Sequence, residues 1–350
     1  MIENKAIKLG IAGFGIVGNK RKACVDSNSD YRLIAVCDQT FDGSGTMNDG
    51  VRYYQKYQDL IKDDLDAILV CMSNDMASEV TTKALNAGLH VFCEKPPGRS
   101  VEEVLTVINT EIKNPSLKLM YGFNHRYHDS IEDALDILNS GELGKVINIR
   151  GLYGKAKLIT FNQPDWRTKR ELSGGGVLLD QGIHMVDLIR LFGGNFQEVQ
   201  SFVSNDHWGY DVEDNAYAIM RSEKGVVAML NSSATQWRHR FHLDINLQKG
   251  SLILGGLLTG TKSYGSETLT VVTADPDHDL GDPKEQTSQY NKDNSWDKEM
   301  KLFANYIIND QEVISGSSSD ALETMKLVFR IYYNDHTWRN SYNIDDPDSK

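Results

Sequence analysis

The sequence predicts an α/β fold in which a doubly wound parallel sheet is followed by a domain rich in antiparallel strands. Three observations lead to this prediction. Apolar strand-like runs alternate with helical patterns up to about residue 123, which is typical of βαβ units. A glycine-rich turn follows the first of these runs. After residue 195, longer strand-like runs are separated by short turns, which favours antiparallel pairing.

The composition indicates a globular protein and excludes several classes of function. The 350 residues suffice for two domains, and 40% of them are hydrophobic and 25% charged. A net charge of −12 without a basic run argues against a nucleic-acid partner. We expect a cytoplasmic protein without membrane association, because no bilayer-spanning stretch or signal peptide is visible. The cysteines form no CxxC pair and are expected to be buried, reduced thiols: Cys24, Cys37, Cys71 and Cys93.

A glycine-rich turn lies between a strand predicted over 5–12 and a helix predicted from Ile16 towards Val25. This G-x-G-x-x-G pattern stands in the context that dinucleotide binding requires. The first glycine permits the tight turn, the second lets the backbone approach a pyrophosphate, and the third lets helix and strand pack closely. The N-terminus of the helix offers N–H groups to the phosphates. The expected cofactor contacts here are Gly13, Phe14, Gly15, Ile16, Val17 and Gly18.

A strand predicted over 31–38 ends in Asp38, which lies 20 positions after Gly18. That is the spacing of a carboxylate that binds the adenosine ribose hydroxyls. The charge of Asp38 would repel a 2′-phosphate, and Gln39 and Thr40 follow with no arginine, so we expect NAD rather than NADP. The alternative is a turn-forming aspartate.

The remaining elements are predicted from hydrophobic periodicity and turn residues. Further strands are expected over 65–72, 89–93, 117–123, 146–152, 196–204, 214–221, 225–234, 240–248 and 251–254, and helices over 57–62, 76–86, 100–113, 130–139, 177–192, 296–309 and 320–340. Ser100 and Glu103 predict a capping box. Residues 275–294 are expected to form a mobile loop or a lid, and 345–350 a frayed tail.

Lys95 follows a strand that must stop. Pro96 and Pro97 come directly after Glu94 and Lys95, and proline has no N–H to continue a strand. Open α/β sheets bind their ligands at the carboxyl ends of the strands. Lys95 is therefore a candidate for contact with a ligand; the alternative is a solvated lysine before a turn.

Asp180 and His184 lie four residues apart in the helix predicted over 177–192. Positions i and i+4 share a helix face, so both side chains can point in one direction. Histidine suits proton transfer near neutral pH, and a nearby carboxylate can orient its ring. The alternative is a core histidine bonded to a carbonyl, with Asp180 as a surface acid.

Three motifs together resemble the Gfo/Idh/MocA family of oxidoreductases. They are Gly13-x-Gly15-x-x-Gly18, Glu94-Lys95-Pro96, and the stretch from Gly174 to Asp187, which reads GGGxxxDxGxHxxD. The resemblance implies a Rossmann NAD-binding domain over 1–123 and a substrate-binding and oligomerisation domain over 124–344. It also implies a large, open, mainly antiparallel sheet in the second domain, a cleft between the domains, and homodimers or homotetramers built through sheet faces.

The resemblance also implies roles for individual residues. Lys95, His184 and Asp180 would be the catalytic groups. Cofactor contacts would also come from Asp38, Ser73, Asn74, Glu94, Lys95, Asn124 and Arg167, and substrate contacts from Lys95, Arg126, Trp166, Arg167, Asp180 and His184. One stretch departs from the family pattern, since Ser73-Asn74-Asp75-Met76-Ala77 replaces Pro-Asn-x-x-His and lacks the histidine.

The expected reaction is reversible hydride transfer between a sugar carbon and the nicotinamide, with His184 taking the hydroxyl proton and Lys95 stabilising the alkoxide. No metal is expected. The resemblance is closest to members associated with surface polysaccharides and nucleotide-linked sugars, so it implies nucleotide-linked sugars as the favoured substrates. Rings and cations could hold a sugar ring and an anionic group, and the alternative is that the tryptophans pack in the sheet and the arginines are surface charges: Trp166, Arg167, Trp237, Arg238 and Arg240. Three alternatives stay open: a dehydrogenase of free sugars or inositol, an NAD-assisted glycoside hydrolase, and a non-catalytic regulator that senses NAD.

Overall fold

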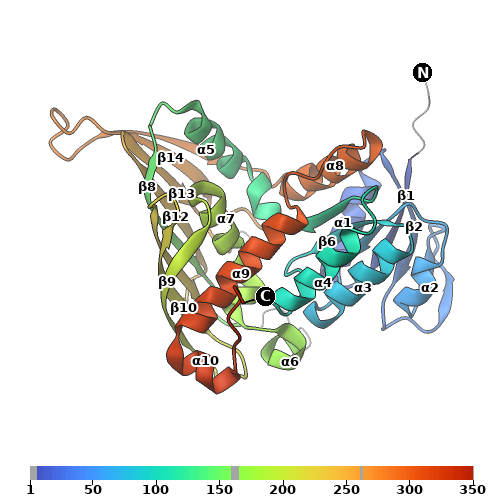
Figure 1. The fold of residues 1–350 in the computed structure, drawn as a ribbon. Helices are drawn as coiled ribbons and strands as arrows, with labels where there is room; N and C mark the ends of the chain where they lie inside the picture. The colour runs from blue at the N-terminus through green and yellow to red at the C-terminus, as the bar shows by residue number, and fades with distance from the viewer. Residues whose placement is uncertain (1–5, 159–164, 261–262, 350) are drawn as a thin grey trace. The chain divides into compact units, whose positions relative to one another are not determined.

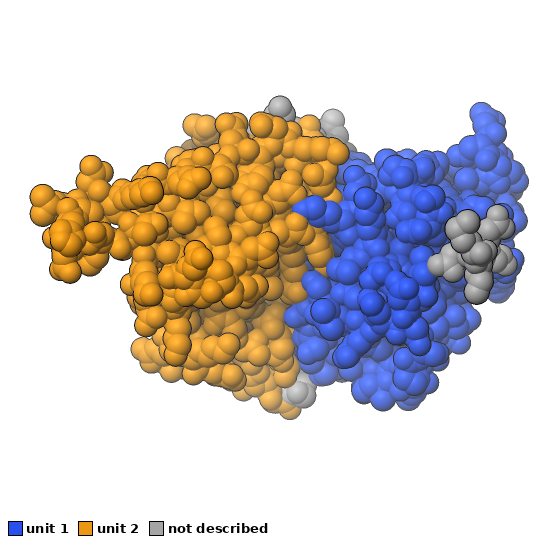
Figure 2. All heavy atoms as spheres, turned by 90° about the horizontal axis from the view of Figure 1, so that it is seen from above, with its two compact units in different colours: residues 1–124, 296–322 blue, residues 125–295, 323–350 orange. Residues whose placement is uncertain are grey.

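The structure, a computed structural model, describes residues 6–158, 165–260 and 263–349 and divides into two compact units (Figure 2). Unit 1 contains the chain up to Asn124 together with 296–322. Unit 2 contains 125–295 and the chain from Glu323 onwards. The break after Asn124 lies next to the expected boundary. Residues 296–322 were expected in the second domain but pack within unit 1.

Unit 1 is built on a seven-stranded sheet with the order β3-β4-β2-β1-β5-β6-β7 (Figure 1). Its strands are β1 (Ile7–Ala12), β2 (Tyr31–Cys37), β3 (Ser44–Thr46), β4 (Arg52–Tyr54), β5 (Ala67–Val70), β6 (His90–Glu94) and β7 (Leu119–Gly122). All neighbours are parallel except β3 and β4. The predicted doubly wound sheet is thus confirmed. The short strands β3 and β4, at one end of the sheet, were not predicted, because three residues are too few to show a period.

The helices of unit 1 begin and end close to the predicted positions. They are α1 (Ile16–Asp26), α2 (Tyr57–Ile61), α3 (Asn74–Asn86), α4 (Val101–Glu111) and, from Trp296 onwards, α8 (Ser295–Ile308). The predicted capping box of α4 is half right. The Ser100 side chain accepts a hydrogen bond from the Glu103 N–H, whereas the Glu103 carboxylate accepts from the N–H of Arg99.

Unit 2 contains an eight-stranded sheet with the order β15-β14-β13-β12-β8-β11-β10-β9. Its strands are β8 (Val146–Gly154), β9 (Phe196–Ser204), β10 (Asn215–Ser222), β11 (Val227–Ser233), β12 (Arg240–Leu247), β13 (Gly250–Gly255), β14 (Glu267–Thr273) and β15 (Lys284–Tyr290). Every neighbouring pair is antiparallel except β8 and β11. The expectation of a large, mainly antiparallel sheet is therefore confirmed.

One face of this sheet packs against helices, while no described element of unit 2 is seen over the other (Figure 1). The helices of the unit are α5 (Asp129–Ser140), α6 (Arg170–Ser173), α7 (Ile183–Gly193), α9 (Ser318–Asn334, in unit 2 from Glu323) and α10 (His336–Tyr342). A Cβ at Gly151 of β8 would meet Met185 and Ile189, so α7 lies directly on the sheet. The structure contains no helix, among its described residues, that is long and apolar enough to cross a membrane.

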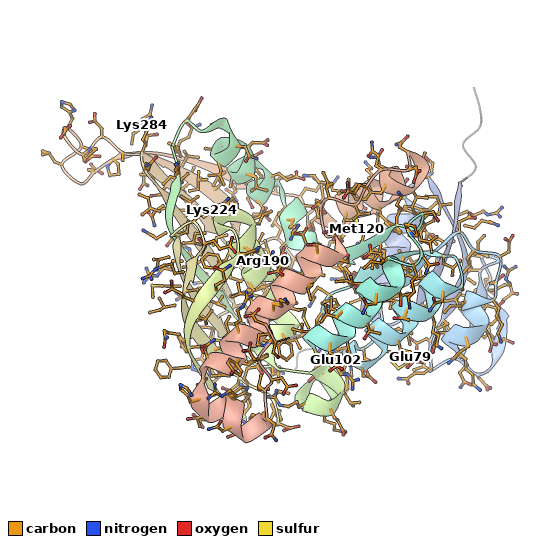
Figure 3. The ribbon with its side chains drawn as sticks, viewed as in Figure 1. Glu79, Glu102, Met120, Arg190, Lys224 and Lys284 are labelled. Atoms are coloured by element: carbon orange, nitrogen blue, oxygen red, sulfur yellow. The ribbon has the colours of Figure 1, made fainter. Side chains whose placement is uncertain are left out.

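Two expectations for unit 2 are wrong. Residues 275–294 are not simply a loop, because they include β15, which forms a hairpin with β14. Lys284 begins β15, next to the protruding loop of this hairpin (Figure 3). The strand is polar on both faces because nearly all of β15 is exposed. The helix expected over 320–340 is broken at Asp335, whose side chain caps α10 by accepting from the Trp338 N–H. The tail is held by Arg330, which donates to Asp348.

A buried ion network joins α1, β6 and α8 in unit 1. The Arg21 side chain is fully buried; its Nε lies 2.7 Å from Glu94 Oε1, and a terminal nitrogen donates to Glu299. Its guanidinium carbon also lies 4.4 Å from the centre of the Phe92 ring and 4.3 Å from that of Trp296. These contacts explain why residues 296–322 pack with the parallel sheet.

Replacing Arg21 with Met should destabilise unit 1 strongly. The variant keeps an apolar stem but leaves Glu94 and Glu299 without their shared cation, a change that costs about 3–5 kcal/mol when a buried pair is broken. Urea unfolding measures the difference in free energy. Lys22→Met, which removes a partly exposed cation from the same helix, should cost no more than about 1 kcal/mol. Equal stability of the two variants would contradict the buried network.

Candidate active site

The cofactor-binding candidates of unit 1 gather at one edge of its sheet. Ala12, Cys37, Val70 and Cys93 are register partners across four neighbouring parallel strands. The residue that follows each of them therefore lies at the same carboxyl edge. This edge carries the glycine turn, Asp38, Ser73, Asn74, Glu94, Lys95 and Asn124. Residues separated by more than one hundred positions are thus brought together by the parallel register.

The structure gives a different reason for glycine at each of the three positions of the turn. Gly13 has a φ of +90°, and a Cβ there would lie 2.4 Å from the Cys71 carbonyl oxygen. A Cβ at Gly18 would lie 2.1 Å from the Gly13 carbonyl oxygen, so the helix can approach the strand only without one. A Cβ at Gly15, in contrast, meets no described atom within 4 Å. The space next to Gly15 is open, which fits the close approach of a pyrophosphate.

Asp38 follows β2 and is held beside the glycine turn. Its Oδ2 accepts a hydrogen bond from the Phe14 N–H at 2.8 Å, and its Oδ1 accepts from the N–H and hydroxyl of Thr40. The first turn of α1 has no acidic residue, and its N-cap Gly15 offers no capping side chain. The helix therefore presents N–H groups and a positive dipole end where phosphates would bind.

Lys95 is half-buried directly after β6, and the Lys95–Pro96 peptide bond is cis. Its neighbour Glu94, expected to contact the cofactor, accepts from Arg21 and so anchors the end of the strand. Ser73 is the N-cap of α3, and Asn74 is buried in its first turn. The structure thus places all four side chains at the edge that the sequence predicted.

A second group of polar residues lies in unit 2 around Asp180. Lys155, directly after β8, places its Nζ 3.3 Å from Asp180 Oδ2, and Arg167 places its Nε 3.4 Å from Oδ1. The Arg167 guanidinium carbon lies 4.3 Å from the centre of the Trp166 ring. Asp180 therefore lies between two cations.

His184 lies one turn after Asp180, on α7, and is 5% exposed. Its ring stacks on that of His125, with ring centres 3.7 Å apart and an angle of 9°. His125 Nε2 lies 3.1 Å from the Tyr153 hydroxyl. Tyr153 also packs against Tyr264, whose hydroxyl accepts from Gln181. His184 thus belongs to a buried cluster of histidine and tyrosine rings.

The helix that carries Asp180 is not a regular α-helix. Leu178–Gly182 forms a π-helical turn before α7 begins, a feature found frequently at functional sites. The buried Glu213 carboxylate caps this turn by accepting from the N–H groups of Gly176 and Leu178, and from the Tyr332 hydroxyl. Burial raises the pKa of Glu213. A Cβ at Gly176 would lie 2.0 Å from the Glu213 carbonyl oxygen, so the glycine run serves close packing.

Arg126, expected to bind substrate, makes two hydrogen bonds of 2.7 and 2.6 Å to Asp187. Both side chains are buried, and the pair fixes the turn after Asn124 to α7. Lys155, Tyr153, Tyr264 and His125 were not predicted as site residues. None of them lies in a recognisable motif, and only the tertiary structure brings them near Asp180 and His184.

The second and third glycines, Gly15 and Gly18, allow a matched test of the cofactor turn. Gly15→Ala should leave the free energy of unfolding nearly unchanged, since its Cβ meets no protein atom, and should weaken NADH binding by about tenfold or more because it fills the phosphate approach. Gly18→Ala should destabilise the fold, since its Cβ would overlap the Gly13 carbonyl. NADH fluorescence titration and urea unfolding measure the two effects. Unchanged NADH affinity in Gly15→Ala would contradict the assignment.

Comparison with known proteins gives two family matches. Residues 7–123 match an oxidoreductase family described as having an NAD-binding Rossmann fold. Residues 131–253 match the GFO/IDH/MocA C-terminal domain. Inositol 2-dehydrogenase of Salmonella typhimurium is 25% identical over 253 residues, which cover 70% of this chain and 72% of that protein.

Solved structures show the same fold over almost the whole chain. Levoglucosan dehydrogenase in complex with NADH has a TM-score of 0.81 at 18% identity, covering 95% of this chain and 98% of that one. The WlbA dehydrogenase from Bordetella pertussis, in complex with NADH and UDP-GlcNAcA, has a TM-score of 0.78 at 18% identity, covering 95% and 96%. By its fold, its NAD-binding unit and both family matches, the chain belongs to the GFO/IDH/MocA family of oxidoreductases.

Proposed function

We propose that the protein is an NAD-dependent oxidoreductase that interconverts a hydroxyl and a ketone on a sugar, with nucleotide-linked sugars as the favoured class. The observation that carries this proposal is Asp180, held between Lys155 and Arg167 one turn before the buried His184. An ionised carboxylate, a histidine and two cations within one unit provide for proton transfer and for binding of a polar substrate.

The residues present fit NAD. The glycine turn leaves open space beside Gly15, and Asp38 lies within a hydrogen bond of the Phe14 N–H, where it can accept from ribose hydroxyls. NAD⁺, when bound, supplies the hydride acceptor of the reaction. The chain itself has to bind and orient the sugar, remove the hydroxyl proton and stabilise the charge that develops on oxygen.

His184 takes the hydroxyl proton during oxidation and returns it during reduction. Its stacking on His125 fixes the plane of the ring, so that the nitrogens keep one direction. Asp180, one turn earlier in the chain, binds the substrate or orients His184. Lys95 is the second catalytic group, and as a cation it stabilises the developing alkoxide.

The favoured substrate class is supported by the cations and rings around Asp180. Arg167 on Trp166 offers a guanidinium that can bind an anionic group, next to a ring that can pack on a sugar. Among the relatives, WlbA binds UDP-GlcNAcA, whereas inositol 2-dehydrogenase is named for a free cyclitol. Free sugars and inositols are therefore the second candidate class.

We also propose that the protein works as a cytoplasmic homodimer or homotetramer. The outer face of the unit 2 sheet exposes large apolar side chains near its β9–β10 edge. Phe202 is 80% exposed and Ile219 is 55% exposed, which is unusual for residues on a broad sheet. Such a face supports association with another copy of the chain.

An absorbance assay tests the proposal. Purified protein with NAD⁺ is mixed with nucleotide-linked sugars, free sugars and inositols, and NADH is followed at its absorbance maximum; the matching keto-sugars are tested with NADH. Turnover with nucleotide-linked sugars is the expected result. Turnover only with free sugars or inositols would move the assignment to the second class. Release of an aglycone without net NADH would replace it with the hydrolase, and NADH binding without any turnover would indicate a regulator.

Lys95→Ala should lower kcat by about 10²–10³, as expected for loss of a group that stabilises a developing oxyanion. The Kd for NADH should change by less than about tenfold, because a tenfold change corresponds to the net free energy of about one hydrogen bond. Steady-state kinetics and NADH titration measure both. Lys83→Ala, which removes an exposed lysine of α3 in the same unit, is the control and should leave both values unchanged. A Lys95→Ala enzyme with normal kcat would exclude Lys95 from catalysis.

A further inference from the structure

Trp237 lies in the segment between β11 and β12 and is 68% exposed. Its ring nevertheless has fixed neighbours. The ring centre lies 5.2 Å from that of His207, at an angle of 65°, and 6.4 Å from that of Trp208, at 73°. Both contacts are edge-to-face, so they orient the indole while leaving most of its surface open. A large ring that is exposed and already oriented suits a flat ligand, because little motion is lost on binding.

The two neighbouring rings are anchored to the backbone. The Trp208 indole N–H donates to the Ala234 carbonyl oxygen at 3.1 Å. The main-chain N–H groups of His207 and Trp208 donate to the buried Asp214 carboxylate at 3.0 and 2.9 Å. The rings of His207 and Trp208 lie 4.8 Å apart at 90°. The three rings of His207, Trp208 and Trp237 thus form one fixed group, the aromatic platform.

The aromatic platform lies on the side of the sheet that carries Asp180. Trp208 packs against a buried cluster that contains Ala234 and Val177. Val177 is the N-cap of the π-helical turn, and Asp180 lies within that turn. The Ser232 hydroxyl donates to the Val177 carbonyl oxygen, so this side of β11 faces the turn. The platform therefore contacts the segment that presents Asp180.

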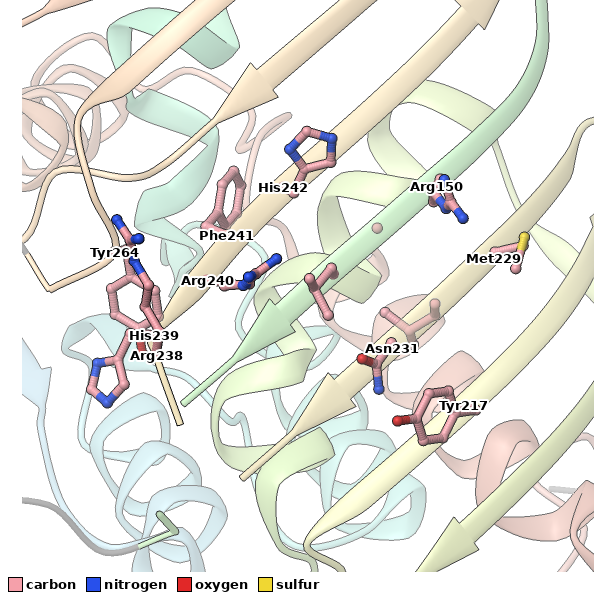
Figure 4. A pocket seen from close by; sticks show the side chains of 13 residues that line it. Arg150, Tyr217, Met229, Asn231, Arg238, His239, Arg240, Phe241, His242 and Tyr264 are labelled. Atoms are coloured by element: carbon pink, nitrogen blue, oxygen red, sulfur yellow. The ribbon is translucent and has the colours of Figure 1, made fainter. Parts of the chain in front are cut away.

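The opposite, uncovered face of the sheet is a separate surface. It contains a hollow whose floor includes Met229, the register partner of the exposed Ile219 (Figure 4). That floor belongs to the face that we propose to associate with another copy of the chain. Arg238 and Arg240, which the sequence analysis considered for an anionic group of the substrate, line this hollow. Trp237 is not among the described residues that line it, which agrees with the contacts of the platform on the Asp180 side.

The segment that carries Trp237 is bound to the backbone of Lys155. The Lys155 N–H donates to the last residue of β11 at 2.8 Å, and the Lys155 carbonyl oxygen accepts from the Gln236 N–H at 3.0 Å. A Cβ at Gly154 would lie 2.2 Å from Cγ of Gln236, so the glycine allows the segment to pack this closely. Lys155 in turn places its Nζ 3.3 Å from Asp180. The segments that hold the platform are thus the ones that hold the Asp180 cluster.

We propose that Trp237 binds a ring that the substrate carries beyond the sugar being oxidised, an inference that rests on the proposed function. The reacting sugar belongs at Asp180 and His184. The exposed platform stands next to them, where the outer part of a larger substrate would extend. The face of an indole packs on the C–H face of a pyranose and on the plane of a nucleobase.

Two kinds of substrate supply such a ring. A nucleotide-linked sugar carries a base, and a glycoside carries a second ring on its anomeric oxygen. Free monosaccharides and inositols carry neither of these rings. The platform therefore favours substituted sugars over the second candidate class.

Calorimetric titration tests the platform with three probes that share one sugar: UDP-glucose, phenyl β-D-glucoside and glucose. The protein is saturated with NADH, so that the cofactor site is filled. At least one ring-bearing probe should bind at least about tenfold more tightly than glucose, because stacking of one ring on an aromatic side chain contributes about that much.

Trp237→Ala should weaken binding of that ring-bearing probe by about tenfold or more and leave glucose binding unchanged. Trp237→Phe keeps a ring and should retain most of the affinity. Ile112→Ala is the matched control, because it removes a side chain that is 69% exposed from unit 1 and should change no affinity. Since both positions are exposed, all three variants should keep the thermal unfolding midpoint and the oligomeric state of the wild type.

Three results would overturn the proposal. They are the absence of tighter binding of either ring-bearing probe than of glucose, the absence of a selective loss of the ring-bearing probe in Trp237→Ala, and a change of oligomeric state in that variant. The last result would mean that Trp237 contacts another copy of the chain. A loss confined to UDP-glucose identifies the base as the bound ring, and a loss confined to phenyl β-D-glucoside identifies the second ring of a glycoside.

Turnover separates this inference from the proposed function, since calorimetry needs no reaction. Ring binding through Trp237 in a protein that oxidises no sugar would refute the proposed function and leave the platform standing as a binding site. Oxidation of a sugar by a protein whose Trp237→Ala variant binds the ring-bearing probes normally would refute only this inference.

Discussion

The buried cation of Arg21 is the contact on which the cofactor-binding unit depends. Burying a guanidinium is favourable only when carboxylates satisfy it, and here Glu94 and Glu299 do so from two other elements. The same bond fixes the end of β6, and Lys95 is the next residue along the chain. A single ion network therefore stabilises the packing of α8 on the sheet. It also fixes the backbone position from which the side chain of the candidate catalytic residue Lys95 extends.

Unit 2 uses a comparable arrangement. Glu213 satisfies two N–H groups at the start of the π-helical turn, and glycines at 175 and 176 allow Tyr332 and the chain at Glu213 to approach closely. The Asp180 side chain projects from the π-helical turn and lies between Lys155 and Arg167. His184 follows one turn later, on α7, and its ring stacks on that of His125. In both units a carboxylate holds the backbone that presents the candidate site residues.

Local signals predicted much of this structure and missed specific parts. Strand β9 and the start of α1 were found at their observed residues, because alternation and the glycine turn are strong short-range patterns. Strand β15 was missed, since a strand exposed on both faces shows no alternation. The break at Asp335 was missed because helical periodicity continues across it. Lys155 and Tyr264 carry no motif, and only strand pairing brings them to Asp180 and Gln181.

The sequence by itself determined the fold class, the cofactor turn and the identity of Asp38, Lys95, Asp180 and His184 as candidates, because each lies within a short motif. The tertiary structure decided which groups surround them. Pairing of β8 with β11 and β12 brings Lys155 to Asp180, and register across four strands assembles the arginine-lined hollow. Such neighbours come from distant positions, and their contacts depend on register and burial, which no local spacing encodes.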